Sequence, residues 1–203
     1  MSDSSSRRKL ARAAARLGAA HGCLLPPLVL MTDDERLEDP LGAARALPRG
    51  SMVVVRTRDP DRRRELTRRL VELSRWRGLF VLVAGDPALA AVADGLHLPE
   101  ARMKEAAHWR ARCPRLLITA SIHSLAGLRN TAFVDALFLS PVFPTASHPG
   151  RAALTPVRAN QMARLAAKPV YALGGLTAGN ALRLSPRSFS GLAAIGALKA
   201  VDP

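Results

Sequence analysis

The sequence predicts an α/β protein, a single-domain (β/α)8 barrel of the TIM-barrel type, on three observations. Short apolar runs recur at fairly regular intervals from Leu28 onward. Segments of helical period or composition lie between these runs, a pattern typical of a parallel sheet whose outer face is covered by helices. Eight such units within 203 residues favour a closed barrel over the runner-up, an open doubly wound sheet.

Each predicted strand is a run of apolar residues, and most of the runs finish in polar or glycine-containing sequence. The runs are 28–32, 52–56, 79–84, 94–98, 115–121, 136–140, 169–175 and 191–197. The clearest helical segments between them are 60–76, 101–112, 124–132 and 155–167. In a barrel the strand ends all meet at the C-terminal rim, where barrel enzymes place their chemistry.

The two ends of the chain are expected to depend on each other. The chain stops at Pro203, a few residues after the eighth strand, and this leaves little sequence for a full final helix. We expect an N-terminal helix over roughly residues 6–20 to cover the part of the barrel left bare. The alternative is a disordered basic tail, since the Ala and Arg content does not decide. The sequence is therefore divided into a basic segment, 1–22, and the barrel, 23–203.

Charge and composition limit the classes of partner. Lys and Arg number 30 against 16 Asp and Glu, a formal charge of +14, so the surface attracts anions. Most of the excess is arginine at helical intervals, which is typical of solvated helix faces. Aromatic residues are only 4% of the chain, and neither a stacking platform nor a recognition-helix pattern is present. These features argue against a nucleic-acid partner, although the charge alone keeps that alternative open.

Three further features indicate a cytoplasmic protein without a membrane partner. Cys23 and Cys113 lack CxxC spacing and a neighbouring His cluster, as expected of ordinary thiols in a reducing compartment. Pro26 and Pro27 interrupt the first apolar run, which argues against a signal peptide. No apolar stretch reaches transmembrane length.

Two arginines end the second predicted strand. Strand alternation puts Arg56 and Arg58 on one face, so both guanidinium groups can point toward the barrel mouth. Their forked donors match phosphate or diphosphate oxygens. The alternative for Arg58 is an ion pair with Asp59 or Asp61.

Glycines at the last two strand ends are candidate phosphate ligands. Gly174 and Gly175 follow the seventh strand, and Gly196 follows the eighth. A barrel commonly holds phosphate here with backbone N–H groups, and glycine lets the anion approach the main chain closely. The alternative for Gly174 and Gly175 is a tight turn.

The loop after the sixth strand, within "FLSPVFPTASHPG", carries further polar groups. Thr145 and Ser147 offer hydroxyl donors for an anion, and His148 is a candidate proton carrier. His123 closely follows the fifth strand. His97 lies inside an apolar strand, and we interpret it as an interior side chain with satisfied hydrogen bonds.

Asp33, Asp34, Asp86 and Asp94 are the carboxylates nearest the predicted strand ends or starts. Asp86 is a candidate ligand of Mg2+, a hard cation that prefers oxygen ligands and shared phosphates. Because Pro87 follows it, Asp86 also fits a helix cap, and we favour the cap.

Taken in order, several strand-end motifs resemble the thiamine phosphate synthase superfamily, which includes a thiazole tautomerase branch. The motifs are "MTDDERL", "ADGLHLPE", "TASIHSL", "LSPVFPTASHPG" and "YALGGLTAGNA", and the resemblance covers residues 28–198. It implies the (β/α)8 barrel and an Mg2+-dependent transferase. That enzyme joins hydroxymethylpyrimidine diphosphate to a thiazole phosphate and releases diphosphate.

The resemblance also implies a role for each candidate residue. Arg56 and Arg58 would hold the diphosphate, and Ser121 would lie near it as it departs. The thiazole side would comprise Thr145, Ser147, Gly174, Gly175 and Gly196. We expect Arg56, Ser121 and His148 to be the catalytic residues, phosphorylated heterocycles to be the ligands, and the barrel to form a homodimer as the family suggests.

The sequence departs from the family at charged positions. His148 stands where the family has Lys, and Gly85 where it has Asn before the aspartate. After the fourth strand only Glu100 could supply the metal carboxylate. Pro141 stands at the position of the tautomerase's catalytic His, so this loop is synthase-like. We therefore expect a thiamine phosphate synthase-like enzyme; the alternative is a catalytically silent barrel that binds thiazole or thiamine phosphates in a regulatory or carrier role.

Overall fold

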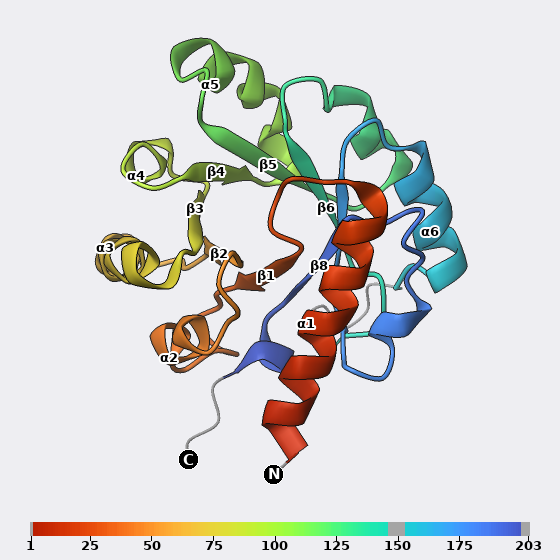
Figure 1. Cartoon of the computed structure of the whole chain (residues 1–203). Helices are drawn as coiled ribbons and strands as arrows, with labels where there is room; N and C mark the ends of the chain where they lie inside the picture. Colours follow the sequence, from red (N-terminus) through yellow and green to blue (C-terminus); the bar gives the residue numbers. More distant parts are fainter. Residues whose placement is uncertain (1, 146–152, 200–203) are drawn as a thin grey trace.

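The protein is a closed barrel of parallel strands with helices around it (Figure 1). The structure is a computed structural model, and it describes residues 2–145 and 153–199. The predicted site residues Ser147 and His148 lie outside the described residues.

The eight strands follow one another around the barrel in chain order. They are β1 (Leu28–Met31), β2 (Met52–Val55), β3 (Phe80–Ala84), β4 (Gly95–Leu98), β5 (Leu117–Ile122), β6 (Ala136–Leu139), β7 (Val170–Leu173) and β8 (Gly191–Ala194). Each strand pairs in parallel with the next, and β1 pairs with β8 through Val29 opposite Ala193. This pairing closes the sheet, so the predicted barrel is confirmed and the open doubly wound sheet is excluded.

The helices on the outside differ widely in length, from 20 residues in α1 and 18 in α3 to four in α4. The α-helices are α1 (Ser2–His21), α2 (Pro40–Arg45), α3 (Pro60–Arg77), α4 (Pro87–Ala90), α5 (Ala106–Arg112) and α6 (Pro156–Leu165). The 3-10 segments are η1 (Glu100–Glu105), η2 (Leu125–Asn130), η3 (Ala181–Arg183) and η4 (Gly196–Leu198). Four α-helices begin with proline after a capping side chain, Asp39, Asp59, Asp86 or Thr155.

Two expected helices are not regular α-helices. The segment 101–112 divides into η1 and α5, and 124–132 forms the 3-10 segment η2. In the first of these segments the backbone N–H of Arg102 donates to the carbonyl oxygen of Pro99 at 2.9 Å, the three-residue spacing typical of a 3-10 turn.

The interior of the barrel is packed solid below its mouth. Phe138 and Tyr171 stack inside it with ring centroids 5.1 Å apart, and both side chains are fully buried. Val29, Met52 and Leu82 pack in the same inner cluster. A second and larger cluster lies between the strands and the helices. The interior is therefore a core rather than a channel, and ligands must bind at the rim.

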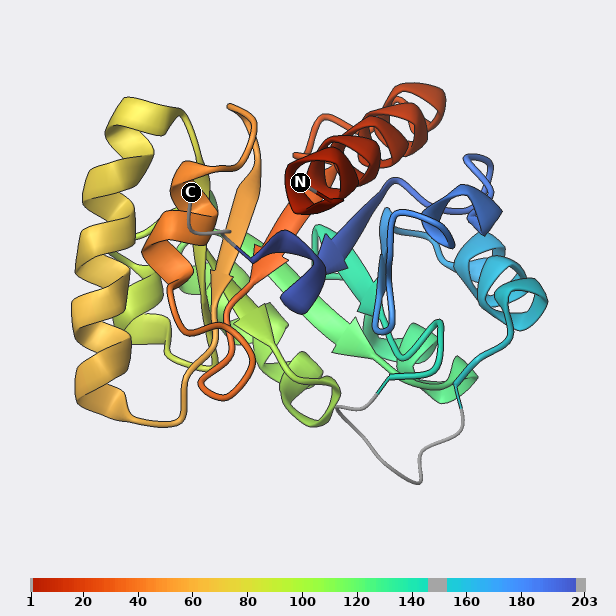
Figure 2. The same cartoon turned by 90° about the horizontal axis from the view of Figure 1, so that it is seen from below.

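Helix α1 covers the barrel wall beside β8 and β1 (Figures 1 and 2). Leu10, Ala14 and Leu17 are fully buried in this contact. Gly18 lies so close to the barrel that a Cβ there would be 2.8 Å from the Cβ of Pro27. Only the short segment η4 follows β8 within the described residues, so α1 supplies the cover that a full final helix would give. The predicted N-terminal helix is confirmed.

Leu17→Ala should lower the free energy of unfolding by about 2–4 kcal/mol, because it leaves a cavity between α1 and the barrel wall. Leu24→Ala is the matched control, since Leu24 is fully exposed and its truncation should change stability by less than about 0.5 kcal/mol. Urea denaturation of both variants checks this. Equal stability of the two variants would contradict the packing of α1.

Candidate active site at the barrel mouth

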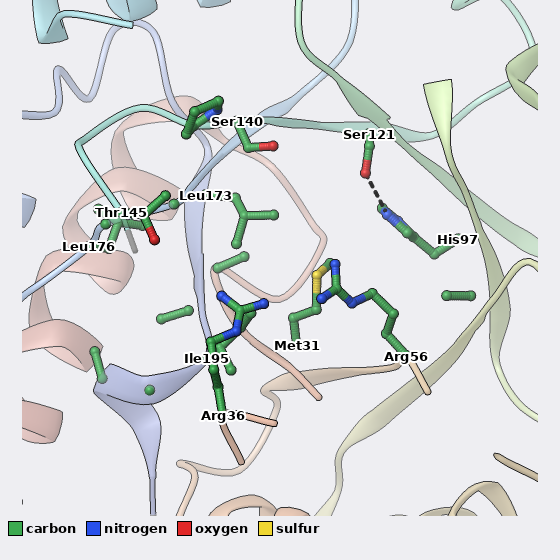
Figure 3. Close-up of a pocket in the computed structure, with 18 of the residues that line it drawn as sticks. Met31, Arg36, Arg56, His97, Ser121, Ser140, Thr145, Leu173, Leu176 and Ile195 are labelled. Atoms are coloured by element: carbon green, nitrogen blue, oxygen red, sulfur yellow. Dashed lines mark hydrogen bonds between the residues drawn. The ribbon is translucent and has the colours of Figure 1, made fainter. Parts of the chain in front are cut away.

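A cavity of about 730 Å³ opens at the C-terminal ends of the strands. Residues that end or follow all eight strands line it, from Met31 of β1 to Ile195 and Gly196 after β8. This volume lies within the range of small-molecule binding sites. Figure 3 shows Arg36 and Arg56 pointing into the cavity, with Ser121 and Thr145 on different sides of it.

Four arginines line the cavity near the ends of β1 and β2: Arg36, Arg56, Arg58 and Arg63. The carboxylate of Asp33 holds two of them. Arg36 donates to it through Nε at 3.0 Å and Nη2 at 2.6 Å, and Nη2 of Arg56 donates to the same group. Burial acts to raise the pKa of Asp33, but the hydrogen bonds and charges of Arg36 and Arg56 outweigh it and hold the pKa far below its usual range. Asp33 is thus a permanently charged anchor.

Arg56 and Arg58 differ in how firmly the protein holds them. Arg56 is held by Asp33, and its backbone N–H donates to Thr32 Oγ1 at 2.8 Å. The Arg58 side chain is 93% exposed, and its nearest carboxylate is Glu35 at 3.8 Å rather than Asp59 or Asp61. The Arg56 side chain is therefore already ordered, whereas the Arg58 side chain must lose conformational entropy to contact a ligand.

Arg36 and Arg63 were not among the site residues predicted from the sequence, and Asp33 was predicted at the rim without a role. Arg63 lies in the first turns of α3 within the run "DRRRE", where composition does not single out one arginine. The position of each arginine around the helix axis determines which one reaches the cavity. Arg63 lines the cavity, whereas Arg64 forms an exposed ion pair with Asp61. The 3.6-residue period of the helix was the signal that could have found it.

Ser121 belongs to a hydrogen-bonded chain with two other side chains. Its Oγ lies 2.9 Å from His97 Nε2, and His97 Nδ1 lies 2.9 Å from the buried hydroxyl of Thr119 (Figure 3). Burial, followed by the charge of Arg56, lowers the pKa of His97 to about 3, so the ring is neutral at pH 7. The edge of the His97 ring also packs on Phe138, with centroids 5.0 Å apart. His97 is an interior side chain that fixes Ser121 at the mouth.

The glycines after β7 serve a structural need. Gly174 and Gly175 have φ of +93° and +62°, which favours glycine. A Cβ on Gly175 would lie 2.3 Å from the carbonyl oxygen of Pro144, so the chain after β6 packs directly on this turn. Thr145, which lines the cavity, follows that contact.

Gly196 differs from the pair after β7, because a Cβ added there would meet no atom within 4 Å. Its main chain borders the cavity, so an anion can approach it closely. Of the three candidate glycines, Gly196 offers the most open approach to the backbone.

The two carboxylates named as candidate ligands of Mg2+ are engaged in other hydrogen bonds. Asp86 Oδ1 accepts from Leu89 N at 3.1 Å and caps α4, as the cap interpretation expected. Glu100 accepts from His123 N at 2.6 Å and from the Ser124 hydroxyl at 3.2 Å. Within residues 2–145 and 153–199, no three His, Cys, Asp or Glu side chains gather as a metal site would require. These residues do not fit a magnesium site, and we derive no step through a metal.

Comparisons with known proteins agree with this geometry. The family model described as thiamine monophosphate synthase matches residues 28–198, which span all eight strands. The chain therefore belongs to the thiamine monophosphate synthase family.

Across the residues that the structure describes, no helix combines the length and apolar character that crossing a bilayer requires.

Individual relatives cover most of the chain. It is 30% identical to the putative thiamine-phosphate synthase 2 of Aquifex aeolicus over 75% of its length and 87% of the relative. It is 33% identical to the thiamine-phosphate synthase of Chlorobium luteolum, over 88% of each chain. The solved thiamine phosphate pyrophosphorylase of Pyrococcus furiosus shares the fold, with a TM-score of 0.67 at 22% identity over 83% of this chain and 84% of that one.

His97 should remain neutral at pH 5, because its pKa lies near 3. Unfolded histidine binds a proton below about pH 6.5 while folded His97 does not, so this residue makes stability fall as pH drops from 6.5 toward 3. Long-range proton–nitrogen NMR spectra check this, with the His97→Asn variant used to assign the signal. A ring protonated at pH 5 would contradict the assignment.

Proposed function

We propose that this protein is a transferase that joins hydroxymethylpyrimidine diphosphate to a thiazole phosphate and releases diphosphate. The observation that carries the proposal is one cavity with anion-binding groups on two arcs of its rim. Arg36 and Arg56 line the arc formed by β1 and β2, and the open backbone of Gly196 follows β8. Two phosphorylated substrates need two such places. Membership in the thiamine monophosphate synthase family supports the assignment of the substrates.

In the proposed reaction, the largest build-up of negative charge is on the departing diphosphate. The thiazole ring nitrogen forms a bond to the methylene carbon of the pyrimidine as the carbon–oxygen bond to diphosphate breaks. The electron pair of that bond leaves with the diphosphate, and positive charge develops on the pyrimidine. Guanidinium groups already held by Asp33 can stabilise the departing diphosphate without reorganising, which is where electrostatic catalysis is most effective.

Ser121 is proposed to donate a hydrogen bond to the departing diphosphate. Thr119 is fully buried and bonds to Nδ1 of His97, so its hydroxyl proton is satisfied when it donates there. The neutral ring then carries its proton on Nε2 and donates it to Ser121 Oγ. This arrangement leaves the Ser121 proton available to a ligand in the cavity.

The thiazole phosphate is proposed to bind at Gly196 and Thr145, with Ser147 as a further donor. His148 would supply the proton or charge that the family draws from Lys, although Ser147 and His148 lie outside the described residues. Gly174 and Gly175 shape this side of the cavity, because Gly174 packs on Pro141 and Gly175 packs on Pro144.

The alternative function is binding without catalysis. It is favoured by one observation, the engagement of Asp86 and Glu100 in helix capping and loop bonds. A regulatory or carrier protein would keep the cavity and bind thiazole or thiamine phosphates without turning them over.

Arg56→Ala should lower kcat/KM for thiamine phosphate formation by about a hundredfold, because it removes a preorganised charge from the leaving group. Arg64→Ala is the matched control, since Arg64 lies exposed on α3 and pairs with Asp61 outside the cavity. The assay supplies both phosphorylated precursors to the purified protein. Tight binding of thiazole phosphate without any turnover would reject the synthase and favour the alternative.

A further inference from the structure

The rim after β3, residues 85–86, is enclosed by two arginines. Arg63 reaches it from α3 on one side, and Arg102 reaches it from η1 on the other. Asp86 on this rim is the carboxylate that the sequence offered as a candidate ligand of Mg2+. Here each oxygen it presents already has a partner.

Arg63 is fixed in place by the main chain. Its Nε and Nη2 donate to the carbonyl oxygen of Thr57 at 3.1 and 2.6 Å, and its side chain is only 20% exposed. Its Nη1 lies 3.6 Å from Asp86 Oδ2, the oxygen that does not cap α4. Arg63 also lines the cavity. A fixed guanidinium therefore stands between the Asp86 carboxylate and the ligand space.

Arg102 occupies the remaining oxygen of this rim. Its Nη1 donates to the carbonyl oxygen of Gly85 at 2.8 Å, while Nε and Nη2 bond to Glu105 at 2.7 Å each. A Cβ at Gly85 would lie 3.4 Å from that Nη1, so the arginine packs where a larger residue would project. Both carboxylate oxygens of Glu105 therefore already accept hydrogen bonds from Arg102.

These contacts make the rim unsuitable for a divalent cation. Mg2+ needs a near-octahedral set of oxygens, commonly with one or two carboxylates among them. Oδ1 of Asp86 accepts from Leu89 N, whereas Oδ2 of Asp86 and the carbonyl oxygen of Gly85 face guanidinium groups. A dication here would lie beside these two like charges. Among the described residues that line the cavity there is no Asp or Glu, whereas four are arginines.

We propose that this cavity binds the diphosphate of its ligand through arginines alone, without a divalent cation. Arg63 takes the place next to the β3 rim that a metal would occupy, and Arg36 and Arg56 contact the remaining oxygens. Guanidinium forks match the geometry of phosphate oxygens and keep their charge at every working pH. The inference rests on the proposed function, because it takes a diphosphate-bearing ligand at this mouth as given.

The first test is calorimetric titration of the whole protein with inorganic diphosphate, once in EDTA and once in excess Mg2+. The proposal expects binding in EDTA at least as tight as in Mg2+. Binding that appears only with Mg2+, or that tightens about tenfold or more when Mg2+ is added, would overturn it.

The second test separates Arg63 from its neighbours on the same helix. Arg63→Ala should weaken diphosphate binding in EDTA by about tenfold, through loss of a charge-assisted hydrogen bond. Arg64→Ala should bind as the unsubstituted protein does. Circular dichroism confirms that both variants fold, and Arg63→Lys should fall between them because it keeps the charge without the fork. A folded Arg63→Ala protein with unchanged affinity would overturn the proposal.

A turnover assay in EDTA and in Mg2+ keeps the two claims apart. Turnover and diphosphate binding that both require Mg2+ would overturn the metal-free site and leave the synthase standing. Diphosphate binding in EDTA with no turnover in either condition would support the metal-free site and reject the synthase.

Discussion

The pairing of β1 with β8 is the constraint on which the rest of the structure depends. It closes the sheet and brings every strand end to one mouth, so residues far apart in the sequence meet there. Closure also leaves a stretch of wall beside β8 and β1 to be covered, and within the described residues only the short segment η4 follows β8. Helix α1 meets that need from the other end of the chain with a stripe of Leu and Ala. The basic N-terminal segment is thus part of the barrel's cover, and its charges lie outside the mouth.

Charge at the mouth is organised by a few hydrogen bonds of the arginines. Asp33 holds Arg36 and Arg56 together, and the main chain of Thr57 holds Arg63. Each arginine is fixed before any ligand arrives, which lowers the ordering cost of binding an anion. The carboxylates at the neighbouring rim, Asp86 and Glu100, are turned toward backbone donors instead. The mouth therefore favours anions over metal cations.

The fold could be predicted from the sequence because an apolar run is a local signal, and each of the eight runs overlaps one strand. The rim positions of Arg56 and Gly196 followed from strand ends in the same way. The partner of Asp33 could not be predicted, since Arg56 lies 23 residues away along the chain and meets it only across paired strands. Glu100 was a candidate metal ligand by resemblance alone. Its bond to the backbone N–H of His123 could not be predicted, because that bond depends on how η1 and η2 pack.

The most direct test of this account is an experimental structure of the protein with inorganic diphosphate, from crystals grown without divalent metal. The account predicts diphosphate at the mouth, with its oxygens within hydrogen-bond distance of Arg56 and Arg63 and no cation beside Asp86. Diphosphate bound on another surface, or held at the mouth only when a metal bound to Asp86 is supplied, would contradict it.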